Sequence, residues 1–221
     1  SALGDVADEL SGTDVETREA DFSDLETLDG AAAALVAEHP DIDLVIAGAG
    51  LDRAQSMLEF DWRQAREDFD VNALSNLVLL SHVAPAMAEW GGGHVTAIAS
   101  LAGLVGMPYE AAYSGSKAAL ATFAQSARAE LEPRGITFTE VFPGFVDTPM
   151  FRANAFKHTY SVAPRDAAEL IYVATLKRRE RLGFPAVEYA RARLAAMLPA
   201  RIRDPLTRSA MDPPRDIQSS R

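Results

Sequence analysis

The sequence predicts an α/β fold built on a doubly wound parallel sheet. Short apolar runs bounded by turn residues alternate with longer stretches of helical periodicity. The runs are apolar on both faces, as strands are when helices cover both sides of a sheet. With 221 residues, 48% of them hydrophobic, the chain can bury one full core. We therefore expect a single domain of three layers, α/β/α.

Four apolar runs are the expected strands of this sheet. They comprise residues 14–22, 42–50, 94–100 and 136–142. The β-branched and apolar residues at 44–46 and 95–98 favour strands that are buried on both faces. The connections between successive parallel strands should cross in the right-handed sense.

Three stretches with helical periodicity lie between these strands. They comprise residues 24–38, 61–90 and 111–131. Pro40 and Pro133 follow the first and the third as stop signals. The stretch 61–90 is long for one globular helix, so we expect a kink or a break near Asn72.

The pattern is less regular beyond Gly144. Residues 151–162 resemble a loop or a pair of short helices, and residues 164–182 begin a helix with Pro164 in its first turn. Apolar residues at helical spacing between 187 and 198 predict a further amphipathic helix. Residues 212–221 predict a frayed end.

The composition excludes several classes of site. The chain has no cysteine, which excludes disulfides and cysteine-based metal sites and is compatible with a reducing compartment. Its four histidines are dispersed without metal-ligand spacing, so we expect no metal. The sequence has neither a signal-peptide pattern at Ser1 nor an uninterrupted apolar run of about 18 residues. We therefore expect a soluble, cytoplasmic protein.

The charge is distributed unevenly along the chain. The net charge of -11 argues against a nucleic-acid partner, which would require clustered Lys and Arg. Residues 1–150 carry 7 basic and 25 acidic side chains, whereas residues 151–221 carry 14 and 7. We favour a basic tail that folds against its own acidic body or against a sister subunit. Contact with an anionic membrane surface is the less favoured alternative.

A tyrosine and a lysine stand four residues apart near the start of the third predicted helix. This spacing places Tyr113 and Lys117 on one helix face. A nearby ammonium favours the phenolate, so we expect a lowered pKa for Tyr113 and a role in proton transfer. Taken alone, such a pair is more often part of a solvated helix face.

Two predicted strands end in residues that suit a ligand site. Ser100 closes the strand 94–100, and residues 143–149 follow the strand 136–142. Ligands bind at the carboxyl ends of strands in open parallel sheets, so both ends point to one crevice. A lone serine at such a place is more often a turn or cap residue.

In combination, these features resemble the short-chain dehydrogenase/reductase family, collinearly from about residue 1 to residue 150. The matching motifs occur in the family's order and spacing: Phe69-Asp70-Val71-Asn72, Ser100-Leu101-Ala102-Gly103, Tyr113-x-x-x-Lys117 and Pro143-Gly144-x-x-x-Thr148. The resemblance implies a Rossmann-like fold in which residues 1–150 form the cofactor-binding and catalytic core. Residues 151–221 would supply the substrate loop, helices and the basic tail of the same domain.

The resemblance implies a nicotinamide-dependent interconversion of an alcohol and a ketone or aldehyde. Tyr113 would be the general acid or base, and Ser100 would polarise the carbonyl. Lys117 would hold the ribose hydroxyls and lower the pKa of Tyr113, and Asn72 would anchor a water in a proton relay.

The cofactor implied is NAD or NADP, without discrimination between them. Besides Asn72, Tyr113 and Lys117, the residues implied in binding it are Asp21, Phe22, Ala47, Gly48, Ala49, Gly50, Pro143, Gly144, Val146 and Thr148. Asp21 and Phe22 would meet the adenine, although Asp21 could equally cap the next helix. Residues 47–50 read Ala-Gly-Ala-Gly where the family has Asn-Asn-Ala-Gly. We expect a different local rigidity there, while close approach of the backbone to the cofactor remains possible.

One departure from the family is larger. The family's phosphate-binding glycine turn does not occur in this sequence, which lacks on the order of 40 residues relative to a typical member, about one strand-helix-strand unit. We favour a chain that has lost its first segment over a natural protein without it. A non-enzymatic binding or scaffold protein that retains the fold is the rival interpretation. A nucleotide-sugar epimerase or dehydratase is disfavoured, because little chain follows Met150.

The resemblance also suggests the substrate and the partners. Apolar residues in segments that border the family's site favour an apolar or amphipathic substrate, contacted by Ser100, Leu101, Met107, Tyr109, Met150 and Phe151. A homodimer or homotetramer is expected, packed through the helices at 61–90 and 111–131. Ala118, Ala119, Ala121 and Ala127 would allow close approach of a twofold mate, unless they pack against their own sheet.

Overall fold

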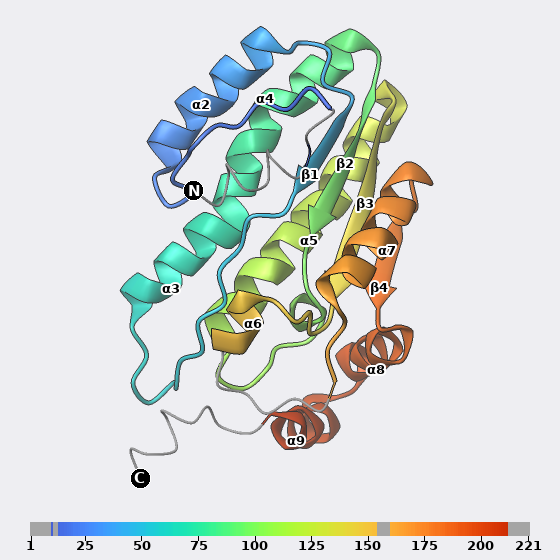
Figure 1. Ribbon diagram of the computed structural model, residues 1–221. Helices are drawn as coiled ribbons and strands as arrows, with labels where there is room; N and C mark the ends of the chain where they lie inside the picture. The colour runs from blue at the N-terminus through green and yellow to red at the C-terminus, as the bar shows by residue number, and fades with distance from the viewer. Residues whose placement is uncertain (1–9, 11–12, 154–159, 212–221) are drawn as a thin grey trace.

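The computed structural model contains one four-stranded parallel sheet (Figure 1). It describes residues 10, 13–153 and 160–211. The strands lie in the order β1 (Leu44–Ala47), β2 (Gly93–Ile98), β3 (Ile136–Pro143) and β4 (Arg181–Phe184). All neighbouring pairs are parallel. The predicted α/β class and its parallel sheet are confirmed.

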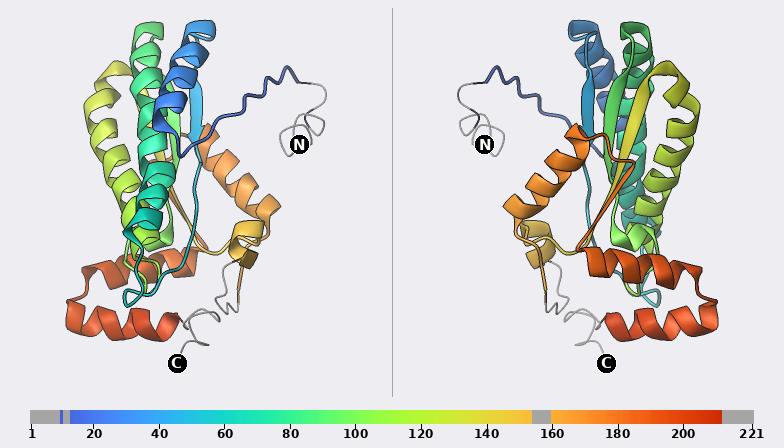
Figure 2. Two further views of the ribbon diagram at one scale, coloured as in Figure 1. Left: turned by 90° about the vertical axis from the view of Figure 1, so that its left-hand side faces the viewer. Right: turned by 90° about the vertical axis from the view of Figure 1, so that its right-hand side faces the viewer.

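Helices cover both faces of this sheet. On one face lie α2 (Leu25–Glu38), α3 (Trp62–Phe69), α4 (Ser75–Trp90) and α5 (Ala111–Leu131), and on the other lies α7 (Pro164–Leu176) (Figure 2). The short α6 (Pro149–Ala153), together with α8 (Ala186–Met197) and α9 (Ala200–Ala210), lies at the end where the strands terminate (Figure 1). The predicted three layers are therefore present.

The predicted break near Asn72 is confirmed as a π-helical segment. Residues Asp70–Leu74 form this wider turn between α3 and α4, and Asn72 within it is fully buried. The whole run Trp62–Trp90 is long and apolar enough to cross a membrane by length and composition. However, Leu80, Val83 and Met87 of α4 are at most 3% exposed, as in the core helix of a globular domain.

The main core lies between the sheet and the helices α4 and α5. Val95 and Ala97 of β2, with Ile136 and Phe138 of β3, pack against side chains of these helices and are at most 2% exposed. These strands are buried on both faces, but the face opposite this core carries hydrogen-bonded polar side chains, namely His94, Thr96 and Thr139. The core therefore fixes the position of α5 relative to the strand ends.

Residues 14–22 do not form the predicted strand. They are extended but unpaired by any strand, and their charged side chains face solvent. Arg18, for example, forms ion pairs with Glu16 and with Glu38 of α2. Alternating charges at 14, 16, 18, 19 and 21 explain the outcome, because a central strand would have to bury them.

The fourth strand of the sheet is β4, which the sequence did not predict. The helix predicted over 164–182 ends at Leu176, and Arg178 follows in a left-handed conformation with φ 47°. The sequence pattern that would predict β4 is weak, because the strand has only four residues and begins with Arg181. That arginine lies 3.2 Å from the buried carboxylate of Glu140 in β3, which accounts for a charged residue in the sheet.

The remaining elements agree with the sequence in part. The predicted amphipathic helix at 187–198 is present as α8, whereas α9 was not predicted. For residues 151–162 we expect a loop or a pair of short helices: residues 151–153 belong to the short helix α6, and residues 160–162 are not helical, with an isolated bridge that joins Val146 to Val162. The predicted frayed end, residues 212–221, and part of the predicted loop lie outside the described residues.

Candidate active site

A pocket of about 770 Å³ opens at the carboxyl ends of the strands. Each strand contributes to its wall through the residues that follow or end it: Gly48, Gly50, Ser100, Pro143, Gly144 and Pro185. Leu194 and Leu198 of α8 and Leu206 of α9 line it from the other side. Its place and size are those of a small-molecule site in an open parallel sheet.

Helix α5 presents Tyr113 and Lys117 to this pocket, one turn apart. The hydroxyl groups of Ser100 and Tyr113 are joined by a hydrogen bond. The ammonium of Lys117 donates to the carbonyl oxygen of Ile98, 3.1 Å away, at the end of β2. The structure thus brings together three of the four predicted catalytic residues.

The close approach of the turn after β2 to α5 depends on Gly103. A Cβ at this position would lie 2.9 Å from the carbonyl carbon of Lys117 and 3.0 Å from its oxygen. No side chain fits at such distances from backbone. Gly103 therefore lets the short 3-10 turn Leu101–Gly103 rest on the helix and holds Ser100 beside Tyr113.

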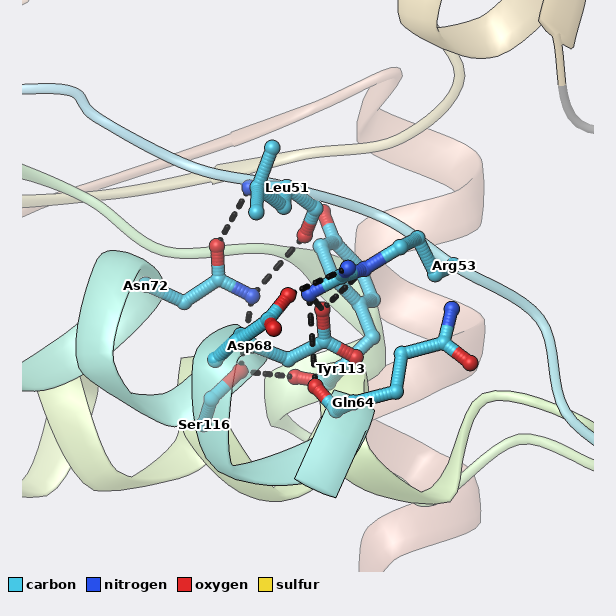
Figure 3. Close-up of polar contacts among 8 residues, drawn as sticks. Leu51, Arg53, Gln64, Asp68, Asn72, Tyr113 and Ser116 are labelled. Carbon is cyan, nitrogen blue, oxygen red and sulfur yellow. Dashed lines mark hydrogen bonds and ion pairs between the residues drawn. The ribbon is translucent and has the colours of Figure 1, made fainter. Parts of the chain in front are cut away.

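Asn72, the fourth predicted residue, lies behind the pocket wall. Its Nδ2 donates to the carbonyl oxygen of Leu51 at 2.8 Å and to the hydroxyl of Ser116 at 2.9 Å (Figure 3). Its Oδ1 accepts from the backbone N–H of Leu51. Asn72 therefore ties the loop after β1 to helix α5, immediately before Lys117.

Gly50 lies where Asn72 and Lys117 meet. A Cβ on this glycine would come within 2.9 Å of the Lys117 Nζ and 3.2 Å of the Asn72 Oδ1. The space beside the ammonium thus exists only because residue 50 has no side chain. This observation fits a site in which another group approaches Lys117 closely.

The pKa of Tyr113 is shifted in the direction opposite to the sequence-based prediction. Burial raises it, the hydrogen bond from Ser100 lowers it, and the carboxyl groups of Asp52 and Glu110 raise it further. Burial lowers the pKa of Lys117 to about 8, against an opposing effect of Asp52. Burial and two carboxyl groups outweigh the expected effect of the ammonium.

Several other predicted residues also line the pocket. Beyond those already placed, they are Leu101, Met107, Val146, Thr148, Met150 and Phe151. Gly48 and Gly144, where we expect the backbone to approach the cofactor, also line the pocket. The sequence therefore located most of the wall contributed by residues 48–151.

Besides Asn72, five predicted residues are not on the pocket wall. Asp21 and Phe22 are exposed at the start of α2, where the carboxylate of Asp21 accepts from the backbone and hydroxyl of Ser23. Asp24, not Asp21, caps α2 by accepting from the N–H of Thr27. The others are Ala47, Ala49 and Tyr109. Tyr109 takes a left-handed backbone conformation with φ 67°, and its carbonyl accepts from the N–H of Gln55.

The sequence-based prediction missed two acidic residues on the part of the wall that precedes α6, Asp52 and Glu110. Glu110 stands three residues before Tyr113, a spacing that already places it on the same side of the helix. Asp52 follows Gly50 by two residues in the loop after β1. The wall formed by α8 and α9 was also missed, and its only sequence signal is amphipathic spacing.

A group of potential metal ligands lies elsewhere on the surface. In the described part of the chain, Glu16, Glu38 and His39 bring ligand atoms within 4.8 Å of one another, and all three are exposed. Arg18 forms ion pairs with both glutamates. The cationic arginine already compensates this acidic pair.

Comparisons with known proteins agree with this geometry. Residues 1–158 match the family model of the short chain dehydrogenases. An uncharacterized oxidoreductase from Myxococcus xanthus is 34% identical over 198 residues, which cover 90% of this chain and 78% of the relative.

A solved short chain dehydrogenase from Burkholderia cenocepacia, in complex with NADP, is 29% identical with a TM-score of 0.74. The likeness covers 88% of this chain and 80% of that one. A structure from Streptomyces avermitilis is 24% identical with a TM-score of 0.75, over 94% of this chain and 83% of that one. The predicted family and Rossmann-like fold are confirmed, and the chain belongs to the short-chain dehydrogenase family of NAD(P)-dependent oxidoreductases.

Proposed function

We propose that this protein interconverts an apolar or amphipathic alcohol with its ketone or aldehyde, with Tyr113 as the general acid or base. The observation that carries the proposal is the hydrogen-bonded pair of Ser100 and Tyr113 on the pocket wall, with Lys117 one turn further along α5. A substrate oxygen placed between the two hydroxyl groups would accept a hydrogen bond from each.

The residues present fit the nicotinamide half of the cofactor. Gly50 leaves space beside the ammonium of Lys117, and a Cβ on Gly144 would lie 3.2 Å from side-chain atoms of Leu101 and Pro185. Lys117, Gly48, Pro143 and Thr148 would hold the group against the strand ends. The NADP complex of the Burkholderia relative supports this proposal. When bound, the cofactor supplies or accepts the hydride at the substrate carbon.

Tyr113 moves the proton in the proposed reaction. In the direction of reduction, the carbonyl carbon gains a hydride and the oxygen gains the proton of the Tyr113 hydroxyl. Burial keeps the pKa of Tyr113 above its ordinary value, so the hydroxyl is protonated at neutral pH and is ready to donate. Ser100 polarises the same oxygen, while the low pKa of Lys117, about 8, leaves its ammonium able to exchange a proton near neutral pH.

The pocket lining supports the apolar part of the substrate. Val105, Met107 and Met150 border the site on the side of Tyr113, and Leu194, Leu198 and Leu206 border it on the side of α8 and α9. Methionine side chains adapt to ligands of different shape. An aryl or alkyl ketone therefore suits this lining better than a small charged carbonyl.

Reduction of acetophenone tests this function, followed by the loss of NADPH or NADH absorbance. Tyr113→Phe should lower turnover by at least ~100-fold, as expected for removal of a general acid. Binding of the cofactor, measured by fluorescence titration, should be nearly unchanged. Tyr172→Phe, on the exposed face of α7, is the matched control and should retain full activity.

Near-normal turnover by Tyr113→Phe would overturn the role of the tyrosine. Failure of the wild-type chain to bind either cofactor would instead favour the rival, a non-enzymatic binding protein that retains the fold. A difference between the NADH and NADPH titrations would establish the cofactor preference.

We further propose that two copies associate through the outer faces of α3, α4 and α5. Trp62, Phe69 and Leu74 are large apolar residues with 58%, 37% and 41% of their surface exposed. Of the four alanines on α5 that are predicted to face a twofold mate, Ala121 is buried in its own core and Ala119 is exposed. Light scattering at micromolar concentration should report a dimer or tetramer, and Ala119→Arg should shift it toward the monomer.

A further inference from the structure

Glu110 is a buried acid on the wall of the pocket. Only 4% of the residue is exposed, although it precedes α5 in a loop. Among the residues that the structure describes, none donates a hydrogen bond to its carboxyl group; burial and the proximity of Asp52 alone raise its pKa, to about 8. A buried carboxyl group without a donor is costly, which points to a ligand as the missing partner.

The structure holds Asp52 close to this acid. The preceding residue, Leu51, is bound at both its N–H and its carbonyl by Asn72. The following residue, Arg53, donates to the buried Asp68 at 2.7 Å and to the carbonyl of Gln64 at 3.3 Å (Figure 3). Asp52 is therefore fixed between two anchored neighbours.

A third contact joins the two loops that carry the acids. The N–H of Gln55 donates to the carbonyl of Tyr109 at 2.7 Å, and Tyr109 immediately precedes Glu110. Its strained left-handed conformation, with φ 67°, aligns that carbonyl with the neighbouring loop. The two carboxyl groups are thus held in place by their loops before any ligand arrives.

The charges around the pocket favour a cation over a neutral group. The ionisable residues on its wall, apart from tyrosines, are Asp52, Glu110, Glu188, Lys117 and Arg191. Arg191 is paired with Glu188 at 2.8 Å, and Lys117 interacts favourably with Asp52. Among the described residues of the wall, Glu110 has no compensating cation. Burial and the nearby Asp52 both oppose ionisation of Glu110. A neutral donor would leave this opposition in place, whereas a cation favours the ionised carboxylate.

We propose that the substrate carries a basic amine, and that its ammonium group binds between the carboxyl groups of Asp52 and Glu110, beside Tyr113. The remainder of the molecule lies along Val105, Met107 and Met150. The substrates would then be amphipathic amino alcohols and their amino ketones. This inference rests on the proposed function, because it names the substrate class of the same site.

Calorimetric binding of two matched probes tests the site without any turnover. The probes are 2-phenylethylamine, which is an ammonium ion at pH 7.5, and the neutral 2-phenylethanol. The wild-type chain should bind the amine at least ~10-fold more tightly, as expected when a charge-assisted hydrogen bond replaces a neutral one. Glu110→Gln and Asp52→Asn should each abolish this preference while leaving the affinity for 2-phenylethanol unchanged.

Glu130→Gln is the control for removal of one negative charge, since Glu130 lies exposed near the far end of the same helix. It should retain the preference for the amine. Thermal melting of each variant shows whether it is folded, and Asp52→Asn serves if Glu110→Gln does not fold. Equal affinity of the wild-type chain for both probes, or a preference that survives in a folded Glu110→Gln or Asp52→Asn variant, would overturn the amine site.

A parallel assay separates this inference from the proposed function. Turnover of 1-phenylethanol that depends on Tyr113, without any preference for the amine probe, would refute the amine site and leave the oxidoreductase function standing. An amine preference that depends on Glu110, without turnover of 1-phenylethanol or of 2-amino-1-phenylethanol, would support the site and refute the function.

Discussion

The amide nitrogen of Asn72 lies 2.9 Å from the hydroxyl oxygen of Ser116, and this contact joins the π-helical turn to helix α5. Ser116 in turn donates to the carbonyl of Tyr113 at 2.9 Å (Figure 3). A continuous chain of hydrogen bonds therefore runs from the loop after β1, through Asn72, to the turn of α5 that carries Tyr113 and Lys117. The position of the catalytic pair depends on residues that never reach the pocket.

Asn72→Ala should destabilise the protein by about 3 kcal/mol, because it leaves buried groups of Leu51 and Ser116 without partners. Ser116→Ala removes only one side of this network and should cost about 1 kcal/mol. The free energy of unfolding in urea measures both. Equal losses of unfolding free energy in the two variants would show that the hydrogen bonds between Asn72 and Leu51 do not stabilise the protein.

Gly50→Ala should lower cofactor affinity and turnover while the fold is retained. Its new methyl group would lie 2.9 Å from the Lys117 Nζ and must displace the ammonium from its place. Gly30→Ala is the control, because Gly30 lies within α2 and a Cβ there meets nothing within 4 Å. The Gly30→Ala variant should be more stable than the wild type by about 0.5–1 kcal/mol, since alanine forms helices better than glycine, and it should retain activity. Normal cofactor binding by Gly50→Ala would contradict the proposed approach to Lys117.

Arg53→Ala should cost about 3 kcal/mol, because Asp68 has a fully buried side chain and would lose its ion-pair partner. Arg66→Ala is a matched control, since Arg66 is 74% exposed and pairs with Asp70 at 3.4 Å across one helical turn. The Arg66→Ala variant should lose about 0.3–0.5 kcal/mol of stability. Urea unfolding of the two variants gives the comparison, and similar losses would argue against a structural role for the Arg53 clamp.

The stability of the protein should fall as the pH rises from 6.5 to 8. The pKa of the Glu110 carboxyl is raised from 4.5 to about 8, so the folded state retains a proton in this range that the unfolded state has lost. Glu110→Gln should flatten the profile. Burial lowers the pKa of His94, which adds the opposite slope only below pH 6.5, where the unfolded histidine becomes charged.

Above pH 8 the slope should change sign. The pKa of Lys117 is lowered from 10.5 to about 8, so between these values the unfolded state holds the proton that the folded state has released. The midpoints of urea unfolding of the wild type and of Glu110→Gln, measured at half-unit steps of pH, check both the fall in stability below pH 8 and the rise above it. A wild-type profile that is parallel to that of Glu110→Gln between pH 6.5 and 8 would refute the shift at Glu110.

The sequence predicted those parts of the fold in which local pattern and tertiary environment agree. The apolar run of β1, and the apolar residues of β2 and β3 that face α4 and α5, form a clear strand pattern, and α5 has a clear helical period. By contrast, β4 is stabilised by the pairing of Arg181 with Glu140, two residues that are 41 positions apart in the chain. A contact between charged side chains so far apart leaves no local signal.

The same reasoning applies to the site. Ser100, Tyr113 and Lys117 stand in motifs whose spacing can be read along the chain, and the structure brings them together. Asp52 and Glu110 belong to two loops that are joined by the hydrogen bond from Gln55 to the carbonyl of Tyr109, and a contact between loops leaves no pattern along the chain. The direction of the Tyr113 pKa shift also depends on these acids and on burial, neither of which the sequence displays directly.

The π-helical turn at Asp70–Leu74 holds about one residue more than an α-helical turn of the same rotation and rise. Deleting one residue within this turn would therefore let it close as a regular α-helix and would leave Leu80, Val83 and Met87 of α4 facing the sheet. The same deletion inside α4 would rotate every residue beyond it by about 100° about the helix axis. The turn is thus the place in this long helix where the chain can be shortened without moving the core, although Asn72 would lose its hydrogen bonds to Leu51 and Ser116.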